Sequence, residues 1–114
     1  MTNQKEPRAP LDMDAEEFRQ AAHKLVDKIA DFLAGISERD VHKPNGAKVA
    51  RDILGAGSLP NSESSTDDVI GEISDLLLEQ SLFNGHPRFW GYVNGSASPI
   101  GALGDLLASS INAN

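Results

Sequence analysis

Histidine is the residue most often used for acid–base or metal chemistry near neutral pH, and the chain has three of them. His86 is the one histidine in an aromatic setting, whereas His23 lies among charged residues and His42 lies in a polar stretch. A metal site is typically recognised by spacings such as HxxxH or CxxC, and the sequence contains neither. No partner base for His86 is visible in the sequence. We therefore expect His86 to cap or pack before a turn, and the other two histidines to be solvated.

Aromatic and branched side chains follow His86, and they suit the wall of a binding site. They are strand-compatible types within five positions, interrupted by one glycine: Phe89, Trp90, Tyr92 and Val93. A tyrosine buried beside a ligand offers an apolar ring face and a hydroxyl that needs a partner. The alternative is that these rings are simply core, and for Trp90 the two interpretations carry equal weight.

A helix is predicted to begin at Ser98-Pro99. The serine hydroxyl can accept a hydrogen bond from a first-turn amide, and proline loses no hydrogen bond at the first helical position. The apolar residues then recur at intervals typical of a helix: Ile100, Leu103, Leu107 and Ile111. Gly101 and Gly104 add a face of small residues, although each interior glycine costs roughly 1 kcal/mol relative to alanine. We therefore expect a helix that is packed on both sides.

The segment from His86 onward resembles the start of the catalytic region in the group II pyridoxal-phosphate-dependent decarboxylases. This is the family of the aromatic-L-amino-acid, tyrosine and histidine decarboxylases. The matching residues are His86, Pro87, Phe89, Gly91 and Tyr92, then Ser98-Pro99, then the run Gly101 to Leu107. In the residues before His86, the chain agrees with the family only in the order of its helices and in their spacing. The resemblance covers the whole chain but only the N-terminal part of such an enzyme, so we expect a fragment or a separately produced N-terminal region.

The resemblance implies a mainly α segment at the N-terminus of a fold-type I, aspartate aminotransferase-like enzyme. Such an enzyme releases the α-carboxylate of an L-amino acid as carbon dioxide, with pyridoxal 5'-phosphate as the electron sink. In the family, the Schiff-base lysine follows a histidine far beyond the matched region. Lys24 and Lys43 each follow a histidine, but both pairs lie outside that motif. Lys5, Lys28 and Lys48 do not follow a histidine. We therefore expect no catalytic residue, no covalently bound cofactor and no activity in this chain alone.

The resemblance also implies a substrate-binding role for three residues. In the family, positions after the FxGY-like run contribute to the substrate pocket beside the cofactor, and they correspond to Tyr92, Val93 and Asn94. Decarboxylases for bulky aromatic substrates tend to carry further aromatic or proline residues where this chain has Val93 and Asn94. These two residues therefore do not decide whether the substrate is an aromatic amino acid, an acidic amino acid or another one. The family's N-terminal helices lie across the other subunit of an obligate dimer, so a homodimer is implied as well.

Composition excludes several other classes of partner. The net charge of -7 argues against binding to nucleic acid or to an anionic membrane, because either would need clustered Lys and Arg. No apolar run approaches the ~20 residues of a membrane span, and the polar N-terminus lacks a secretory signal. The absence of cysteine excludes disulfides and suits a cytoplasmic location.

Three more helices are predicted upstream of His86. The first begins at Asp14, which forms a capping pair with Glu17, and its apolar periodicity extends to about Ser37. A short helix is expected over Ala47 to Leu54. The third is capped by Ser65 or Thr66 and ends at Asn84-Gly85.

These elements suggest three parts: a flexible N-terminal arm over 1–12, a helical, dimer-covering segment over 13–85, and the start of a catalytic domain over 86–114. The first and third helices each carry one apolar stripe that neither can bury alone. Packed together they hide part of it, and the remainder needs the catalytic body or a second subunit. The alternative, from another class of protein, is a free-standing helical interaction module that self-associates through these stripes.

Overall fold

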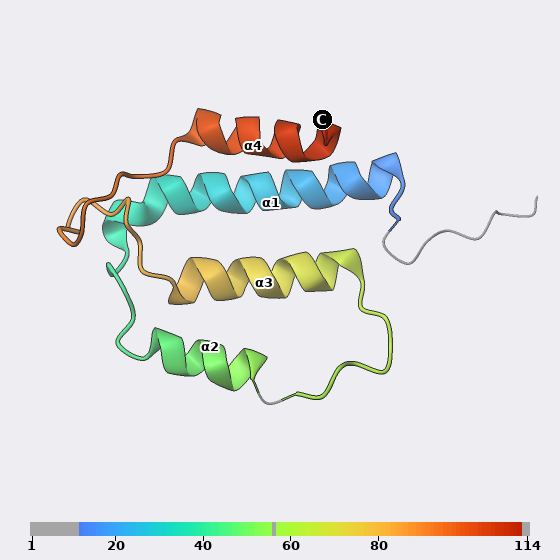
Figure 1. The fold of residues 1–114 in the computed structure, drawn as a ribbon, viewed down its shortest axis with the longest axis horizontal. Helices are drawn as coiled ribbons and strands as arrows, with labels where there is room; N and C mark the ends of the chain where they lie inside the picture. The colour runs from blue at the N-terminus through green and yellow to red at the C-terminus, as the bar shows by residue number, and fades with distance from the viewer. Residues whose placement is uncertain (1–11, 56, 113–114) are drawn as a thin grey trace, which may run out of the picture.

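The computed structural model describes residues 12–55 and 57–112, and these form four α-helices (Figure 1). The helices are α1 (Ala15–Gly35), α2 (Gly46–Leu54), α3 (Thr66–Gln80) and α4 (Pro99–Ile111), and a 3-10 turn, η1 (Ile36–Glu38), extends α1. No strand occurs within the described residues, so the prediction of a mainly α chain is confirmed. The predicted N-terminal arm lies outside the described residues except for Asp12.

The helix starts follow the capping residues that the sequence predicts. The Asp14 carboxylate accepts hydrogen bonds from the amides of Glu16 and Glu17, at 3.0 and 2.9 Å. The Ser65 hydroxyl accepts from the Asp68 amide at 3.0 Å, and the Ser98 hydroxyl caps α4 in the same way. Each cap satisfies an amide that has no partner within its own helix.

The predicted end of the third helix is wrong. The chain leaves α3 at Ser81, which is extended, and Asn84-Gly85 lies in a separate turn. A tertiary contact explains the early exit, because the Phe83 amide donates to the Val41 carbonyl at 3.1 Å. The aromatic run after His86 is likewise irregular and does not form a strand.

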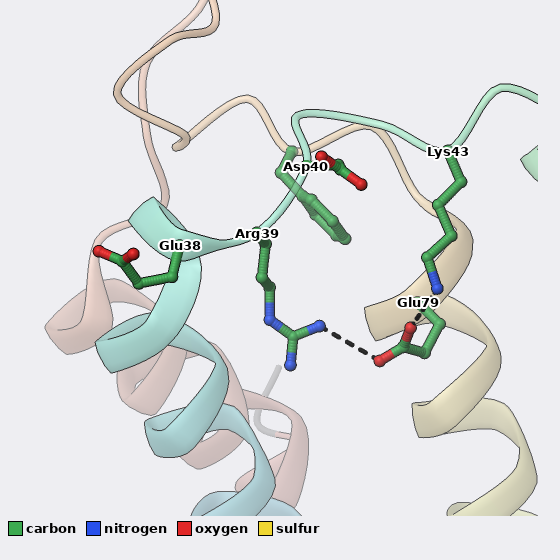
Figure 2. A pocket seen from close by; sticks show the side chains of 6 residues that line it. Glu38, Arg39, Asp40, Lys43 and Glu79 are labelled. Carbon is green, nitrogen blue, oxygen red and sulfur yellow. Dashed lines mark hydrogen bonds and ion pairs between the residues drawn. The ribbon is translucent and has the colours of Figure 1, made fainter.

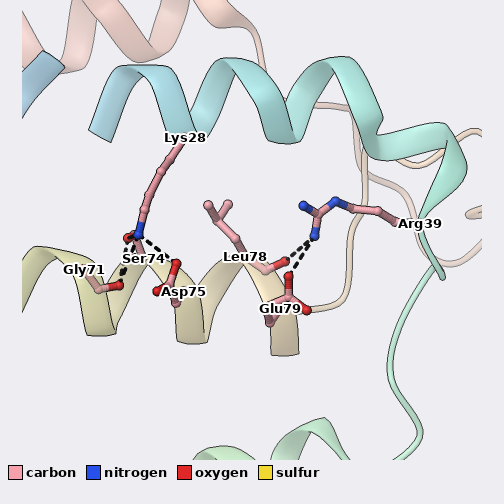
Figure 3. Close-up of polar contacts among 7 residues, drawn as sticks. All are labelled: Lys28, Arg39, Gly71, Ser74, Asp75, Leu78 and Glu79. Atoms are coloured by element: carbon pink, nitrogen blue, oxygen red, sulfur yellow. Dashed lines mark hydrogen bonds and ion pairs between the residues drawn. The ribbon is translucent and has the colours of Figure 1, made fainter. Parts of the chain in front are cut away.

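Helix α3 lies between α1 and α2, and its seam with α1 is rich in polar contacts (Figures 1 and 3). The Lys28 ammonium donates to the Ser74 hydroxyl at 2.9 Å, to the Asp75 carboxylate at 2.7 Å and to the Gly71 carbonyl at 3.5 Å. An ammonium group has three N–H donors, so this set uses all of them. Ser74 is buried, and its hydrogen bonds fix α1 against α3 at one point along the seam.

Helix α2 approaches α3 at Gly46, which is buried. A Cβ atom at this position would lie 2.7 Å from the Gln80 carbonyl oxygen. Glycine is required here because that distance is too short for any other side chain.

The hydrophobic core is small. Ala21 is the one buried apolar residue in the part of the chain that the structure describes, and no large side chain there is completely covered. The predicted apolar stripes of α1 and α3 do face one another in part, but each leaves a row of large side chains exposed: Phe18, Val26 and Ile29 on α1, and Val69, Ile73 and Leu77 on α3.

Helix α4 does not pack against any other described helix, although Figure 1 draws it along the side of α1 away from α3. All of its residues are exposed, including Ile100, Leu103, Leu107 and Ile111. The expectation of a helix packed on both sides is therefore not met within this chain. None of the described helices is long and apolar enough to cross a membrane.

We expect Gly46→Ala to lower the free energy of unfolding by about 1–3 kcal/mol, because its methyl group would push α2 away from Gln80. Gly71→Ala is the matched control, since a Cβ there meets nothing within 4 Å. It should raise stability by up to about 1 kcal/mol through helix propensity. Urea unfolding followed by circular dichroism measures both, and equal effects would contradict this account of the α2–α3 contact.

Candidate functional site

A polar junction forms around Arg39, which follows η1 beside the last turn of α3 (Figure 2). The Arg39 guanidinium donates to the Leu78 carbonyl and to the Glu79 carboxylate, both at 3.3 Å. Lys43 pairs with the other carboxylate oxygen of Glu79. These side chains border an open hollow of about 250 Å³, lined by Glu38, Arg39, Asp40, Lys43, Glu79 and Phe83.

Aromatic rings support the Arg39 side chain. Its guanidinium lies over the Phe32 ring, 5.2 Å from the centroid, where a cation is attracted to the ring face. The Phe32 and Phe83 rings are tilted against each other with centroids 5.0 Å apart. The junction therefore joins α1, α3 and the segment after α3.

Glu79 is the titratable group that this junction perturbs. The hydrogen bond from Lys43 lowers the pKa of the Glu79 carboxyl below its ordinary value of 4.5, and Arg39 adds to the effect while partial desolvation opposes it. Glu79 is consequently an ionised acceptor at neutral pH. Such a group suits ion pairing and does not suit general-acid catalysis.

His86 is tied to the same junction through the backbone of Arg39. It is only 3 % exposed, and its Nε2 bonds the Arg39 carbonyl at 2.9 Å. Its Nδ1 accepts from the Arg88 amide at 3.0 Å. These partners assign the neutral tautomer with the proton on Nε2. The predicted packing role of His86 is confirmed, since both ring nitrogens are bonded to backbone.

Residues 85–96 form a loop with its two ends close together, here called the Tyr92 loop. A Cβ atom on Gly85 would lie 3.4 Å from the Ser96 Cβ and 3.7 Å from Ile36 of η1. The Phe89 ring packs against Gly91, where a Cβ would lie only 3.0 Å from it. Compact loops of this kind are often functional.

The three predicted substrate-binding residues lie together in the Tyr92 loop and are exposed to solvent. Tyr92 is 88 % exposed and Val93 is fully exposed, and Asn94 is exposed as well. Trp90 is 91 % exposed, so it does not belong to a core within this chain. Tyr92 also has a φ of 60°, a left-handed conformation that costs a bulky residue roughly 1–2 kcal/mol. Tyrosine is not a residue type that predicts a positive φ, so this strain was not expected from the sequence.

The described lysines are all engaged in ion pairs with carboxylates: Lys24 with Asp67, Lys28 with Asp75, Lys43 with Glu79 and Lys48 with Asp52. Lys5 lies outside the described residues. The described residues also contain no group of three or more side chains suited to holding a metal ion.

Comparison with known proteins identifies relatives for nearly the whole chain. A tyrosine decarboxylase from rice (Oryza sativa subsp. japonica) is 35% identical over 102 residues, which are 88% of this chain and 19% of the relative. An aromatic-L-amino-acid decarboxylase from Bacillus atrophaeus is 28% identical over 90% of this chain and 21% of its own length. The mouse aromatic-L-amino-acid decarboxylase is 29% identical over 87% of this chain and 20% of the relative.

The chain resembles the N-terminal region of tyrosine and aromatic-L-amino-acid decarboxylases. The resemblance to the group II decarboxylases predicted from the sequence is thus confirmed. The chain spans about a fifth of the length of the curated relatives it matches. No family model and no solved structure matches it.

Glu79 should make the stability of the chain depend on pH. Because its pKa is lowered on folding, its stabilising contribution is present above about pH 4.5 and is lost as falling pH protonates the carboxylate in the folded chain. The group is 45% exposed, so solvent screening limits the contribution to about 0.5–1 kcal/mol. Glu79→Gln should therefore be less stable than the parent chain at pH 7, and the difference should vanish in acid.

Urea unfolding at a series of pH values measures this difference. Glu72→Gln is the control, because Glu72 is an exposed carboxylate on the same helix. A Glu79→Gln variant that tracks the parent chain at every pH would contradict the ion-pair account.

Proposed function

We propose that this chain provides the N-terminal helical part of a pyridoxal-phosphate-dependent L-amino-acid decarboxylase. In this proposal, residues 13–85 cover a dimer interface and residues 86–114 begin the catalytic domain. The observation that supports it most is the similarity to tyrosine and aromatic-L-amino-acid decarboxylases over about 88% of the chain. The exposed Tyr92 loop and the uncovered helix α4 are what such a part would offer to a larger body.

The chain's own role in this enzyme would be to form one wall of the substrate pocket. The cofactor, where bound, supplies the electron sink for loss of carbon dioxide. Tyr92 would offer a ring face and a hydroxyl hydrogen bond, Val93 would contact the substrate side chain, and Asn94 would offer an amide. Burial of this loop against the remaining enzyme would exclude water from the reacting group.

The homodimer is part of the same proposal. The exposed rows of α1 and α3 are apolar, and a subunit interface is the usual cover for an apolar surface of this kind. The same rows favour the second candidate function, a helical module that self-associates without any catalytic body. The two proposals differ in the Tyr92 loop, which a self-association module has no need to hold in a strained conformation.

The first test is of the isolated chain. Mixed with pyridoxal phosphate, it should give no stable imine absorbance and no carbon dioxide from tyrosine or tryptophan, because no lysine of the chain matches the Schiff-base motif of the family. A stable imine band together with decarboxylation would refute the proposal that the chain acts only as part of a larger enzyme.

The second test is a chimera in which this chain replaces the matching N-terminal region of the rice tyrosine decarboxylase. We expect the chimera to decarboxylate an L-amino acid, and Tyr92→Ala to lower kcat/KM by roughly 10- to 100-fold, the range for loss of a pocket contact. Leu59→Ala removes an equally exposed apolar side chain outside the Tyr92 loop and should leave kcat/KM unchanged. Equal effects of the two substitutions would exclude the pocket role.

A further inference from the structure

We propose that His86 is a positioning residue: its Nε2 hydrogen bond to the Arg39 carbonyl fixes the direction in which the Tyr92 loop leaves the helices. This inference rests on the proposed function for its consequence in catalysis. The anchoring of the loop by His86 does not depend on the proposed function, because it involves residues of this chain alone.

The two hydrogen bonds of His86 differ in what they join. The bond from the Arg88 amide to Nδ1 spans two residues and shapes a local turn. The bond from Nε2 to the Arg39 carbonyl spans 47 residues and joins the loop to the residue that follows η1. Only the second can set the orientation of the loop relative to the helices.

Burial makes the Nε2 bond hard to replace. When an exposed hydrogen bond breaks, water can bond to the freed groups at little cost. A buried polar group left without a partner lowers the stability of the fold by about 1–3 kcal/mol. His86 is 3 % exposed, whereas the parallel bond from the Arg88 side chain to the same carbonyl, at 3.2 Å, is exposed. Of these two hydrogen bonds to the Arg39 carbonyl, the one from His86 is therefore the one that solvent does not weaken.

The tip of the loop contributes little to its own placement. Trp90, Tyr92 and Val93 are almost wholly exposed, and Tyr92 touches the rest of the loop through a tilted contact with Phe89, at 6.5 Å between ring centroids. The left-handed φ of Tyr92 raises the energy of this arrangement further. Placement of the three proposed substrate residues is accordingly decided at the base of the loop, where His86 lies.

Two substitutions separate the two bonds. Glutamine places its amide N–H near the position of Nε2 and can still donate to the Arg39 carbonyl, but it lacks an acceptor near Nδ1. Asparagine places its carbonyl oxygen near Nδ1 and can still accept from the Arg88 amide, but it does not reach Arg39. His86→Gln therefore keeps the anchor, and His86→Asn keeps the turn.

The measurement is the distance between two nitroxide spin labels in the full chain, on Asp27→Cys of α1 and Asn94→Cys of the loop. The chain has no cysteine, so these labels are specific. We expect one narrow distance in the His86 parent, the same distance in His86→Gln, and a distribution at least twofold broader in His86→Asn. A broad parent distribution, an unbroadened His86→Asn or a broadened His86→Gln would each overturn the proposal.

Circular dichroism controls for folding. If His86→Asn loses its helical signal, His86→Gln decides the matter alone: an unchanged distance supports the anchor and a broadened one refutes it. In the active chimera, His86→Asn should raise KM roughly tenfold with little change in kcat, and His86→Gln should restore KM. An inactive chimera with the expected label distances would refute the proposed function and leave the anchor standing.

Discussion

Arg39 joins three parts of this chain by using its side chain and its backbone for different neighbours. Its guanidinium reaches the end of α3 and lies over Phe32, and its carbonyl accepts a hydrogen bond from His86 Nε2. Arg39 thus links the base of the Tyr92 loop to the α1–α3 pair. A rigid base and an exposed tip are what a binding loop needs, because the base fixes geometry while the tip stays available to a ligand.

The second constraint is the shortage of buried apolar surface. Full burial of a Leu or Ile side chain contributes about 1.5–3 kcal/mol, and a whole domain is stable by only about 5–15 kcal/mol. Helix α4 alone leaves Ile100, Leu103, Leu107 and Ile111 more than half exposed. The forgone stabilisation is of the same order as the stability of a small domain. In the proposed function this surface is covered by the catalytic body and the second subunit.

Local signals in the sequence predicted most of the fold. Asp14, Ser65 and Ser98 mark helix starts because a side-chain cap acts within three residues of its helix. The end of α3 was predicted wrongly because the contact between Phe83 and Val41 is tertiary. The periodicity of α4 predicted its helix correctly, but within this chain neither side of the helix is covered. A pattern shows which face is apolar and not what covers it.

The residues of the candidate site were likewise predicted in part and missed in part. Resemblance brought Tyr92, Val93 and Asn94 forward, and the structure shows them exposed in the Tyr92 loop. Their substrate-binding role stays a prediction. Arg39 and Glu79 were missed because their pairing spans 40 residues, and single charges in a chain with 24% charged residues give no sign of such a partner. The left-handed Tyr92 was missed because no glycine or asparagine marks that position.

The heat capacity change on unfolding tests the central claim most directly, because it reports the apolar surface that folding buries. Scanning calorimetry should be done at a concentration where light scattering gives the monomer mass of 12.2 kDa. A chain of 114 residues with an ordinary core would give about 1.4–1.7 kcal/mol/K. The open packing described here predicts a value well below 1.4 kcal/mol/K. A value within the ordinary range would show that the monomer buries its apolar faces by itself, and would contradict the account.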